Sequence, residues 1–523
     1  MLKKLESETA ASDTPDAITE IENRKKRVLA MGGPDKLAKR KAAGILNARE
    51  RIERLVDEGS YIETGLFAVS SVVADDRHST PADGKVAGFA RVDGRPVGVV
   101  SNDFTVKGAS SSLTNMKKIG HVKRVATERG FPLVFFGESS GARMPDNMGS
   151  RGMGTLLGND PQQYVRRRES PWVSAILGQC YGSSAWYSCM SDFTVMRKGS
   201  TLAVASPVLA SLAIGQTVEA EELGGWALHS EVTGLVDSVV ETDEEAVEQM
   251  RRFLSYLPSH NQEAPPRVAV PEGSGAAAAK LDEIVPENRR RVYDVRKVIK
   301  AVVDKDSFFE LKPRFGKAAV IGLARLDGQS VGVVANNPMG KAGAMDVQTC
   351  EKITRFLVMC DSFNIPIIML VDTPGFVIGV EGERLKAPGK IMNFMTALQM
   401  CSVPKLSVIM RKSYGQAYLN MGGGRNSDEV AAWPTAEVSF MEPAYAIQVV
   451  TWGRQIDDGA RSAMQEAMEK DNDVWNMAEI YAVQSVIAPQ QTRDYLIRML
   501  EVHTMRPSNG VGRHHMAAWP TTY

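Results

Sequence analysis

The sequence predicts an α/β protein made of two copies of one domain. Residues 86–100 read VAGFARVDGRPVGVV, and a close copy, VIGLARLDGQSVGVV, begins at residue 320, so the offset is 320 − 86 = 234. This offset holds without a gap as far as Gly141 and Gly375. In both copies, apolar strand patterns alternate with helical stretches, which is typical of layered α/β folds.

The repeat extends beyond this stretch on both sides. Val56-Asp57, Ser60 and Glu63 recur as Val303-Asp304, Ser307 and Glu310, and Tyr181-Gly182 recurs as Tyr414-Gly415. Because the period has the length of a domain, the repeat indicates a duplicated domain and not a solenoid.

Each copy shows the same order of expected elements. An alternating strand ends at Asp93-Gly94 or Asp327-Gly328, dipeptides that favour a tight hairpin, and a second apolar strand follows. A helical stretch then leads to a short buried strand and a glycine-containing turn. Another strand and a segment rich in small residues complete the copy.

The repeat and a change in composition between its copies divide the chain into four parts. Residues 258–280, PSHNQEAPPRVAVPEGSGAAAAK, are rich in Pro, Gly and Ala and predict a linker. The expected parts are an N-terminal helical extension (1–35), a first domain (36–257), the linker (258–280) and a second domain (281–523).

Composition excludes several classes of protein. The 523 residues include 62 basic and 62 acidic ones, so no net charge attracts the chain to nucleic acid or to an anionic membrane. The five cysteines show no CxxC spacing, and the seven histidines form no metal-binding set. The N-terminus has no secretory signal, and no apolar run approaches the ~20 residues that cross a bilayer. We expect a cytoplasmic protein with no metal, no nucleic-acid partner and no membrane segment.

Two motifs suggest other enzymes and are rejected. Residues 137–141, GESSG, fit the GxSxG pattern of serine hydrolases, but the turn at the same place in the second copy, VDTPG, has no serine at the nucleophile position. Residues 372–375, DTPG, resemble a GTPase switch, but the chain has no GxxxxGK[ST] phosphate loop. A tight turn between strand and helix explains the glycines of both motifs.

A third feature recurs in both copies. CYGSS at 180–184 and SYGQA at 413–417 each follow a predicted strand. Glycine lets a ligand approach the backbone there, and the N–H groups that open a helix can stabilise a developing negative charge. The spacing alone is equally compatible with a glycine that only starts a helix close to a sheet.

These residues also carry a resemblance to a known family. The chain resembles the acyl-CoA carboxylase beta-subunit, or carboxyltransferase, family, which includes propionyl-CoA and methylcrotonyl-CoA carboxylases. The resemblance covers nearly the whole chain after residue 35. The matching stretches include KAAGILNARERIERLVDEGSYIE, SSGAR, EELGGWALHSEVTGLVDSVV, CDSFNIPIIMLVDTPGF, KSYGQAY and AAWPTAEVSFM. It implies two tandem crotonase-like domains, which accounts for the duplication.

The resemblance also implies a site and a reaction. CO2 would pass from carboxybiotin to the alpha carbon of an acyl-CoA, with the thioester enolate at Gly182-Ser183 and the biotin ureido oxygen at Gly415-Gln416. The backbone N–H groups of Ser183 and Gln416, and not their side chains, would be the donors. Further expected substrate-binding residues are Gly141, Ala142, Arg143, Tyr181, Tyr414 and Leu419.

Partners follow from the same resemblance. The chain lacks an AMKM biotin-attachment motif, so the biotin would arrive on a carboxyl carrier and be carboxylated by a separate biotin carboxylase. The chain itself would form a homo-oligomer with a hexameric core, in which each active site lies between the N-terminal half of one subunit and the C-terminal half of another.

Three departures from the family pattern leave alternatives open. Gly-Ser replaces the more usual Gly-Gly of the first site, and Gly-Gln replaces the Gly-Gly or Gly-Ala of the second. Leu419 stands where propionyl-CoA enzymes have an acid. The basic run at 166–168 is either a solvated face or a clamp for CoA phosphates. The alternatives are an acyl-CoA decarboxylase or transcarboxylase, carboxylation of a non-CoA ketone or activated carbonyl compound, and a scaffold without catalytic activity.

Overall fold

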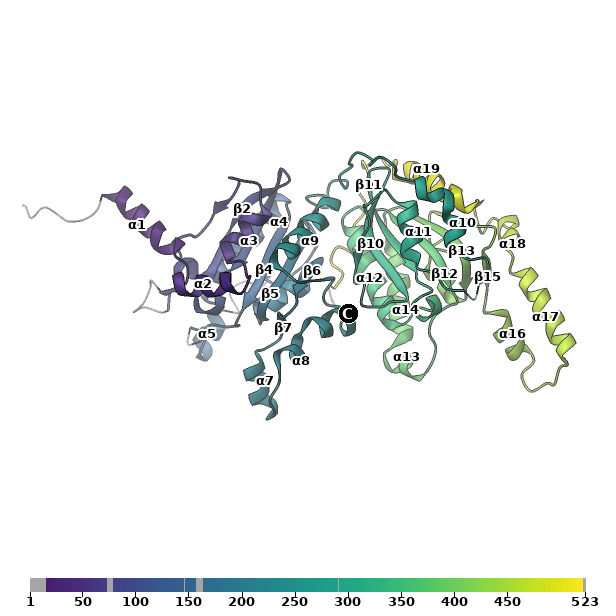
Figure 1. Ribbon diagram of the computed structural model, residues 1–523, viewed down its shortest axis with the longest axis horizontal. Coiled ribbons are helices and arrows are strands. Elements are labelled where there is room, and N and C mark those ends of the chain that lie inside the picture. The colour runs from purple at the N-terminus through teal and green to yellow at the C-terminus, as the bar shows by residue number, and fades with distance from the viewer. Residues whose placement is uncertain (1–15, 73–78, 145, 157–162, 290, 521–523) are drawn as a thin grey trace, which may run out of the picture.

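Two α/β units lie side by side in the computed structural model (Figure 1), which describes residues 16–72, 79–144, 146–156, 163–289 and 291–520. The N-terminal half is purple to blue in the figure, and the C-terminal half is teal to yellow. Each half is built around an eight-stranded sheet, so the predicted α/β duplication is confirmed.

The first sheet has the strand order β1-β2-β3-β4-β5-β6-β8, with β7 pairing with the end of β5. The pairs β1–β2 and β2–β3 are antiparallel, and the remaining pairs are parallel. The strands are β1 (Ile62–Glu63), β2 (Lys85–Val92), β3 (Arg95–Asn102), β4 (Leu133–Ser139), β5 (Trp172–Tyr181), β6 (Phe193–Arg197), β7 (Thr201–Ala203) and β8 (Ser238–Val240).

The second sheet repeats this arrangement in the order β9-β10-β11-β12-β13-β14-β16, with β15 pairing with β13. Its strands are β9 (Phe309–Leu311), β10 (Ala319–Leu326), β11 (Gln329–Asn336), β12 (Ile367–Thr373), β13 (Lys405–Tyr414), β14 (Glu429–Ala432), β15 (Glu437–Ser439) and β16 (Ser485–Val486).

Helices connect and flank the strands of both sheets. In the N-terminal half they are α1 (Ala17–Leu29), α2 (Pro34–Ala42), α3 (Ala48–Leu55), α4 (Leu113–Arg129), α5 (Gly149–Leu156), α6 (Ser183–Met190), α7 (Pro207–Ile214), α8 (Ala220–Gly224) and α9 (Asp243–Tyr256). In the C-terminal half they are α10 (Leu281–Ile284), α11 (Val295–Val302), α12 (Val347–Ser362), α13 (Val380–Arg384), α14 (Ala387–Met400), α15 (Gln416–Asn420), α16 (Pro443–Val450), α17 (Asp458–Asp471), α18 (Val474–Glu479) and α19 (Thr492–Thr504). Residues 1–15 of the predicted extension lie outside the described residues, and α1 projects from the first unit (Figure 1).

The upstream match between the copies has a physical explanation. Asp93 and Gly94 both have positive φ, as a two-residue type I′ hairpin requires. Their N–H groups donate to the carboxylate of Asp57 at 3.0 and 2.8 Å. In the second copy, the corresponding N–H groups donate to Asp304 at 3.1 and 2.7 Å. Each aspartate therefore fixes the hairpin that sets the register of its sheet.

A hydrophobic core joins the two halves. Phe193 of the first half stacks on Phe253 with ring centroids 4.7 Å apart and also contacts Phe309 of the second half at 5.7 Å. Beside this cluster, the buried Lys312 pairs with Asp237 across the boundary at 3.1 Å. The halves are therefore joined by an apolar core and by ion pairs of Asp237 with Lys312 and Arg355.

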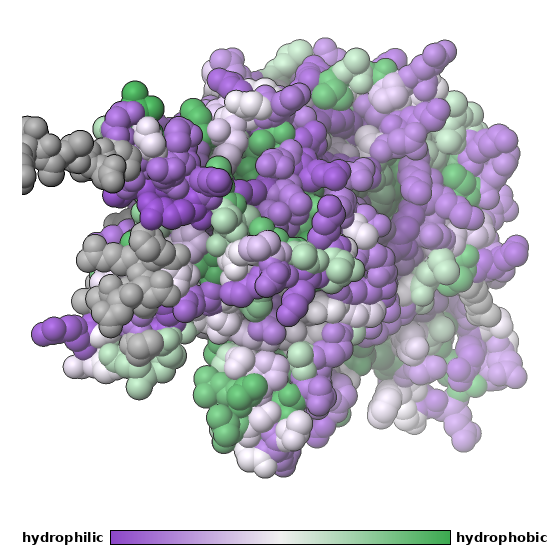
Figure 2. Space-filling view, turned by 60° about the vertical axis from the view of Figure 1, so that its left-hand side comes forward, coloured by the Kyte–Doolittle hydropathy of each residue, from purple (hydrophilic) through white to green (hydrophobic). Residues whose placement is uncertain are grey.

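Some apolar residues of the helices remain exposed on the surface of the chain. Helix α7 has no buried residue, and Val208, Leu212 and Ile214 are 71%, 76% and 60% exposed. Figure 2 shows the hydrophobic side chains gathered on the lower projection of this face, where α7 hangs below the first unit in Figure 1. Helix α16, which follows β15 as α7 follows β7, exposes Tyr445 and Val449 in the same way. No helix among the described residues is long and apolar enough to cross a membrane.

Candidate functional site

The two recurrent glycines occupy equivalent turns. Gly182 lies between β5 and α6 with φ 62° and ψ −128°, and Gly415 lies between β13 and α15 with φ 60° and ψ −146°. A residue with a Cβ disfavours this region of positive φ. Their separation, 415 − 182 = 233, is one residue shorter than the main offset. The prediction that the glycines are structurally equivalent is confirmed.

The residue after each glycine opens a helix. The N–H of Trp186 donates to the carbonyl of Gly182, and the N–H of Tyr418 donates to that of Gly415. The N–H groups of Ser183 and Gln416 precede these first bonds, where a helix offers no internal acceptor. The N–H of Gly415 already donates to the carbonyl of Ser439 at 2.9 Å. Gln416, and not Gly415, therefore supplies the available donor of the second turn.

A second segment lies against the first turn. The N–H of Ser111 donates to the carbonyl of Gly141, and the N–H of Arg143 donates to the carbonyl of Ser111, both at 2.8 Å. Ala142, between them, uses neither its N–H nor its C=O in this bridge, so both point to the other side. A Cβ on Gly182 would lie 3.7 Å from the Cα of Gly141. The N–H groups of Ala142 and Ser183 thus border the same strand-end edge.

The second half reproduces this bridge with different residues. The N–H of Met345 donates to Gly375, and the N–H of Val377 donates to Met345, which leaves the N–H of Phe376 pointing away. Sequence reasoning missed Ser111, Met345 and Phe376. The 234-residue offset contained the signal, because it relates Ser111 to Met345 and Ala142 to Phe376.

The side chains of Ser183 and Gln416, which differ from the family pattern, form hydrogen bonds with neighbouring side chains. The Oγ of Ser183 lies 2.7 Å from the Oγ of Ser111 in a hydrogen bond. The Nε2 of Gln416 donates to the Oδ1 of Asn420 at 3.1 Å, one turn along α15. Both contacts leave the main-chain N–H as the common donor of the two turns.

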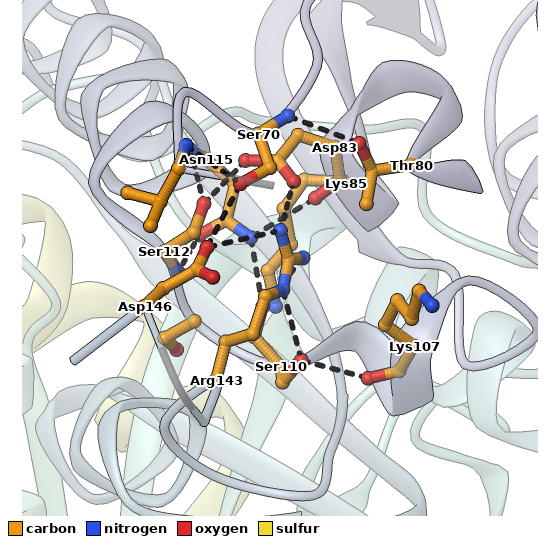
Figure 3. A network of polar contacts seen from close by, with 12 residues as sticks. Ser70, Thr80, Asp83, Lys85, Lys107, Ser110, Ser112, Asn115, Arg143 and Asp146 are labelled. Carbon is orange, nitrogen blue, oxygen red and sulfur yellow. Dashed lines mark hydrogen bonds and ion pairs between the residues drawn. The ribbon is translucent and has the colours of Figure 1, made fainter. Parts of the chain in front are cut away.

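Arg143 lies inside a buried polar network (Figure 3). Its Nη1 pairs with the carboxylate of Asp83, its Nε donates to the Oγ of Ser110 at 3.2 Å, and its Nη2 donates to the carbonyl of Ser110 at 3.1 Å. Ser112 also donates to Asp83, and Asn115 donates to the carbonyls of Asp83 and Ser110 at 2.9 Å. The guanidinium therefore holds the segment carrying Ala142 and does not face an open cavity.

The same network contains backbone strain and a buried amine. Ala82 and Asp83 have φ of 49° and 48°, the left-handed region that costs non-glycine residues free energy. The Nζ of Lys85 donates to the carbonyl of Ala109 at 2.7 Å. Burial lowers the pKa of Lys85 to about 7, with the nearby charge of Arg143 adding to the effect. The Asp83 turn is thus held in place by packing and by the ion pair with Arg143.

The remaining expected ligand contacts have mixed environments. Tyr414 is buried and donates its hydroxyl to Glu437 at 2.7 Å. Burial, with the Glu437 carboxylate adding to it, raises the pKa of Tyr414. Tyr181 is buried, and Leu419 is half-buried beside Gly424. Both tyrosine side chains are therefore buried, and Tyr414 uses its hydroxyl within the fold.

The basic run at 166–168 is not a simple solvated face. Arg166 and Arg168 are 8% and 3% exposed, and both pair with Asp192. Arg168 also donates to the carbonyls of Ala517 and Trp519, which ties the C-terminal segment to the first half. Only Arg167 of the three is exposed. The expectation of a solvated face is wrong for two of the three arginines, because a buried aspartate pairs with both.

Comparison with known proteins gives a consistent result. The model of the carboxyl transferase domain family matches residues 39–517. The carboxyltransferase subunit of propionyl-CoA carboxylase from Haloferax mediterranei is 35% identical over 500 residues, covering 93% of this chain and 96% of the relative. The alpha subunit of methylmalonyl-CoA decarboxylase from Veillonella parvula is 33% identical over 496 residues, covering 94% and 96%.

Solved structures agree over the same length. The crystal structure of the transcarboxylase 12S hexamer with hydrolysed methylmalonyl-CoA bound is 32% identical and aligns with a TM-score of 0.87, covering 95% of this chain and 97% of that one. A single-chain, multi-domain long-chain acyl-CoA carboxylase is 30% identical and aligns with a TM-score of 0.82, covering 93% of this chain and 49% of that one.

Proposed function

The chain belongs to the carboxyl transferase family. We propose that it is the carboxyltransferase subunit of a biotin-dependent carboxylase acting on an acyl-CoA. The observation that carries the proposal is the duplicated turn at Gly182 and Gly415, each followed by a helix-opening N–H. Two such turns in one chain fit a reaction with two carbonyl-type oxygens to polarise, one on each reactant.

The first turn is the proposed thioester site. The N–H groups of Ser183 and Ala142 would donate to the thioester oxygen as the alpha carbon loses its proton and the enolate charge develops. Such fixed donors stabilise charge without reorganisation, and one of them typically accounts for about a hundredfold to a thousandfold in rate. Ser111 and Arg143 act indirectly, because they hold the two donor segments together.

The second turn is the proposed biotin site. Biotin bound to a carrier protein supplies an activated carboxyl group and a ureido nitrogen that can accept the substrate proton. The N–H groups of Gln416 and Phe376 would hold the ureido oxygen. A Cβ at position 415 would come within 3.1 Å of the carbonyl of Phe440, so both this close approach and the positive φ favour glycine at the turn.

We further propose that the domains are crotonase-like and that active sites form between subunits. The two turns end strands of two different sheets. The exposed apolar helices α7 and α16 stand beside them, after β7 and β15. The related transcarboxylase 12S assembles as a hexamer, and a closed homo-oligomer would bury these helices. The proposed location is the cytoplasm, with a biotin carboxylase and a biotin carrier as partners.

A decarboxylase is the second candidate, because the similar Veillonella protein is the alpha subunit of methylmalonyl-CoA decarboxylase. The deciding experiment reconstitutes the chain with a biotin carboxylase and a biotinylated carrier and measures the fixation of radiolabelled bicarbonate into acyl-CoA substrates. A carboxylase requires ATP for label incorporation. Release of CO2 from a carboxyacyl-CoA without ATP, and no fixation with it, would favour the decarboxylase.

A further inference from the structure

A cavity of about 760 Å³ lies on the outer side of α4, away from the proposed active site. One wall is the α4 face that carries Lys117, Gly120 and Arg124, and the other is the segment that carries Arg167 and leads into Trp172. Trp172 begins β5, whereas the Gly182 turn follows its end. Ten strand residues span about 30 Å, so this end of the cavity is far from the oxyanion donors.

The charges around the cavity are predominantly positive. Lys117, Lys123, Arg124 and Arg167 face two carboxylates, Glu128 and Glu169. Arg124 pairs with Glu128 at 3.0 Å, and the Nζ of Lys123 donates to the carbonyl of Gln163. Neither Lys117 nor Arg167 has a hydrogen-bond or ion-pair partner among the residues that the structure describes. Lys117 and Arg167 therefore line the cavity, one from each wall, without a partner among the described residues.

Gly120 leaves space on the α4 wall of the cavity. It lies in the interior of α4, where glycine costs about 1 kcal/mol relative to alanine. A Cβ at the half-buried Gly120 would meet nothing within 4 Å, as is also true of the helical glycines Gly154 and Gly389. Packing and backbone conformation therefore do not require glycine at this position. The missing side chain keeps the cavity open along the helix.

The aromatic wall narrows the ligand class. The ring of Trp172 is already contacted by the guanidinium of Arg166 at 4.7 Å and by the Nζ of Lys123 at 5.6 Å. Trp172 is only 3% exposed, so its ring offers no open face for a stacked base. From Lys117 to Glu128 the helix runs about 16 Å at ~1.5 Å per residue, which suits several linked phosphate groups. Charge, and not base stacking, would provide the affinity.

We propose that this cavity is a binding site for a phosphate-rich small anion, held between Lys117 and Arg167 and admitted by the missing side chain at Gly120. The same chemistry occurs in a free polyphosphate or nucleotide and in the phosphate-bearing end of coenzyme A. The Gly182 turn lies at the other end of β5, so binding of a free anion at this cavity can be measured independently of carboxyl transfer.

The test is calorimetric titration of the full-length protein with tripolyphosphate, ADP and coenzyme A at low ionic strength. Lys117→Ala and Arg167→Ala should each weaken tripolyphosphate binding about tenfold or more, as expected for the loss of a charge-assisted contact. Arg129→Ala removes an exposed charge from the last turn of the same helix, outside the cavity, and should leave binding unchanged. No binding of tripolyphosphate to the wild type, or undiminished binding to the Lys117→Ala/Arg167→Ala double variant, would overturn the proposal.

Gly120→Leu separates binding from folding. Leucine has a higher helix propensity than glycine, so Tm should stay the same or rise while binding is lost. If Gly120→Leu folds and binds tripolyphosphate as tightly as the wild type, the cavity is not the site.

Steady-state kinetics of the reconstituted complex distinguish coenzyme A from a free polyphosphate or nucleotide as the source of the anion. A tenfold higher KM for the acyl-CoA in the double variant, with kcat unchanged, would assign the cavity to coenzyme A. An unchanged KM with lost tripolyphosphate binding would assign it to a free polyphosphate or nucleotide.

Discussion

At the scale of single residues, the proposed chemistry depends on main-chain N–H donors. The side chains of the same residues form hydrogen bonds within the fold. Ser183 is the informative position, because its hydroxyl is held by Ser111 while its N–H opens α6. A serine at this position is therefore compatible with a turn in which the backbone polarises the substrate. The same holds for Gln416, whose amide bonds Asn420.

Substitutions at the first turn test this assignment. Ser183→Ala and Ser183→Gly keep the N–H and should retain most of the carboxylation rate. Gly182→Pro replaces a φ of 62° with one near −65° and should lower kcat at least about a hundredfold, the usual cost of one oxyanion donor. The measurement is kcat in the reconstituted complex with saturating biotinylated carrier. A folded Ser183→Ala protein as inactive as Gly182→Pro would show that the hydroxyl is the catalytic group.

Asp83 is predicted to act through Arg143. Asp83→Asn removes the nearer of the two carboxylates beside the buried guanidinium and loosens the segment that carries the N–H of Ala142. We expect kcat to fall on the order of tenfold to a hundredfold with little change in KM, because small misplacements of reacting groups are costly. Asp146→Asn, 3.9 Å from the same guanidinium, should have the smaller effect. A raised KM with normal kcat would instead make Arg143 a substrate contact.

At the scale of secondary-structure elements, the duplication preserved specific supports of the sheet. Lys118 of α4 and Lys352 of α12 are 352 − 118 = 234 residues apart. The Nζ of Lys118 donates to the carbonyl of Lys85, and the Nζ of Lys352 donates to that of Ala319, at the first residue of β2 and of β10 respectively. Each helix is thus fastened to its sheet by a buried lysine.

Burial has a consequence for the pH dependence of stability. It lowers the pKa of Lys352 to about 7 from an ordinary value of 10.5. Between these values the unfolded chain binds more protons, so the free energy of unfolding should rise with pH, by about 1.4 kcal/mol per unit for each such lysine. Lys352→Met should reduce this slope, measured by urea unfolding between about pH 7.5 and about pH 9. An unchanged slope would mean that Lys352 stays protonated in the folded protein.

Local patterns predicted the elements better than they predicted the contacts between them. The Asp-Gly hairpins and the strand–glycine–helix turns were visible because turn chemistry and strand periodicity are local. The match of Asp57 to Asp304 was also visible, but its reason, two hydrogen bonds to a hairpin 36 residues away, required the fold. The family resemblance implied that Arg143 contacts the ligand, whereas its pairing with Asp83, 60 residues earlier, required the fold.

At the scale of the whole molecule, the exposed helices predict an assembly. Leu212→Glu places a charge on α7, where 76% of the leucine is exposed, and should dissociate the oligomer in sedimentation velocity. Ile62→Glu, a change of a similarly exposed residue on β1 (70%), should leave the assembly intact. If Leu212→Glu sediments as the wild type does, α7 is not an intersubunit contact.

In the proposed assembly the thioester turn of one subunit works with the biotin turn of another. Mixing two inactive chains tests this arrangement directly. Gly182→Pro disables the first turn and Gly415→Pro the second. In a mixed pair, one composite site carries both lesions and the other carries none. Half of randomly reassembled pairs are mixed, and half of their sites are intact, so about a quarter of the wild-type carboxylation rate should return. Sites contained within single chains would give no recovery at all, and that result would contradict the account.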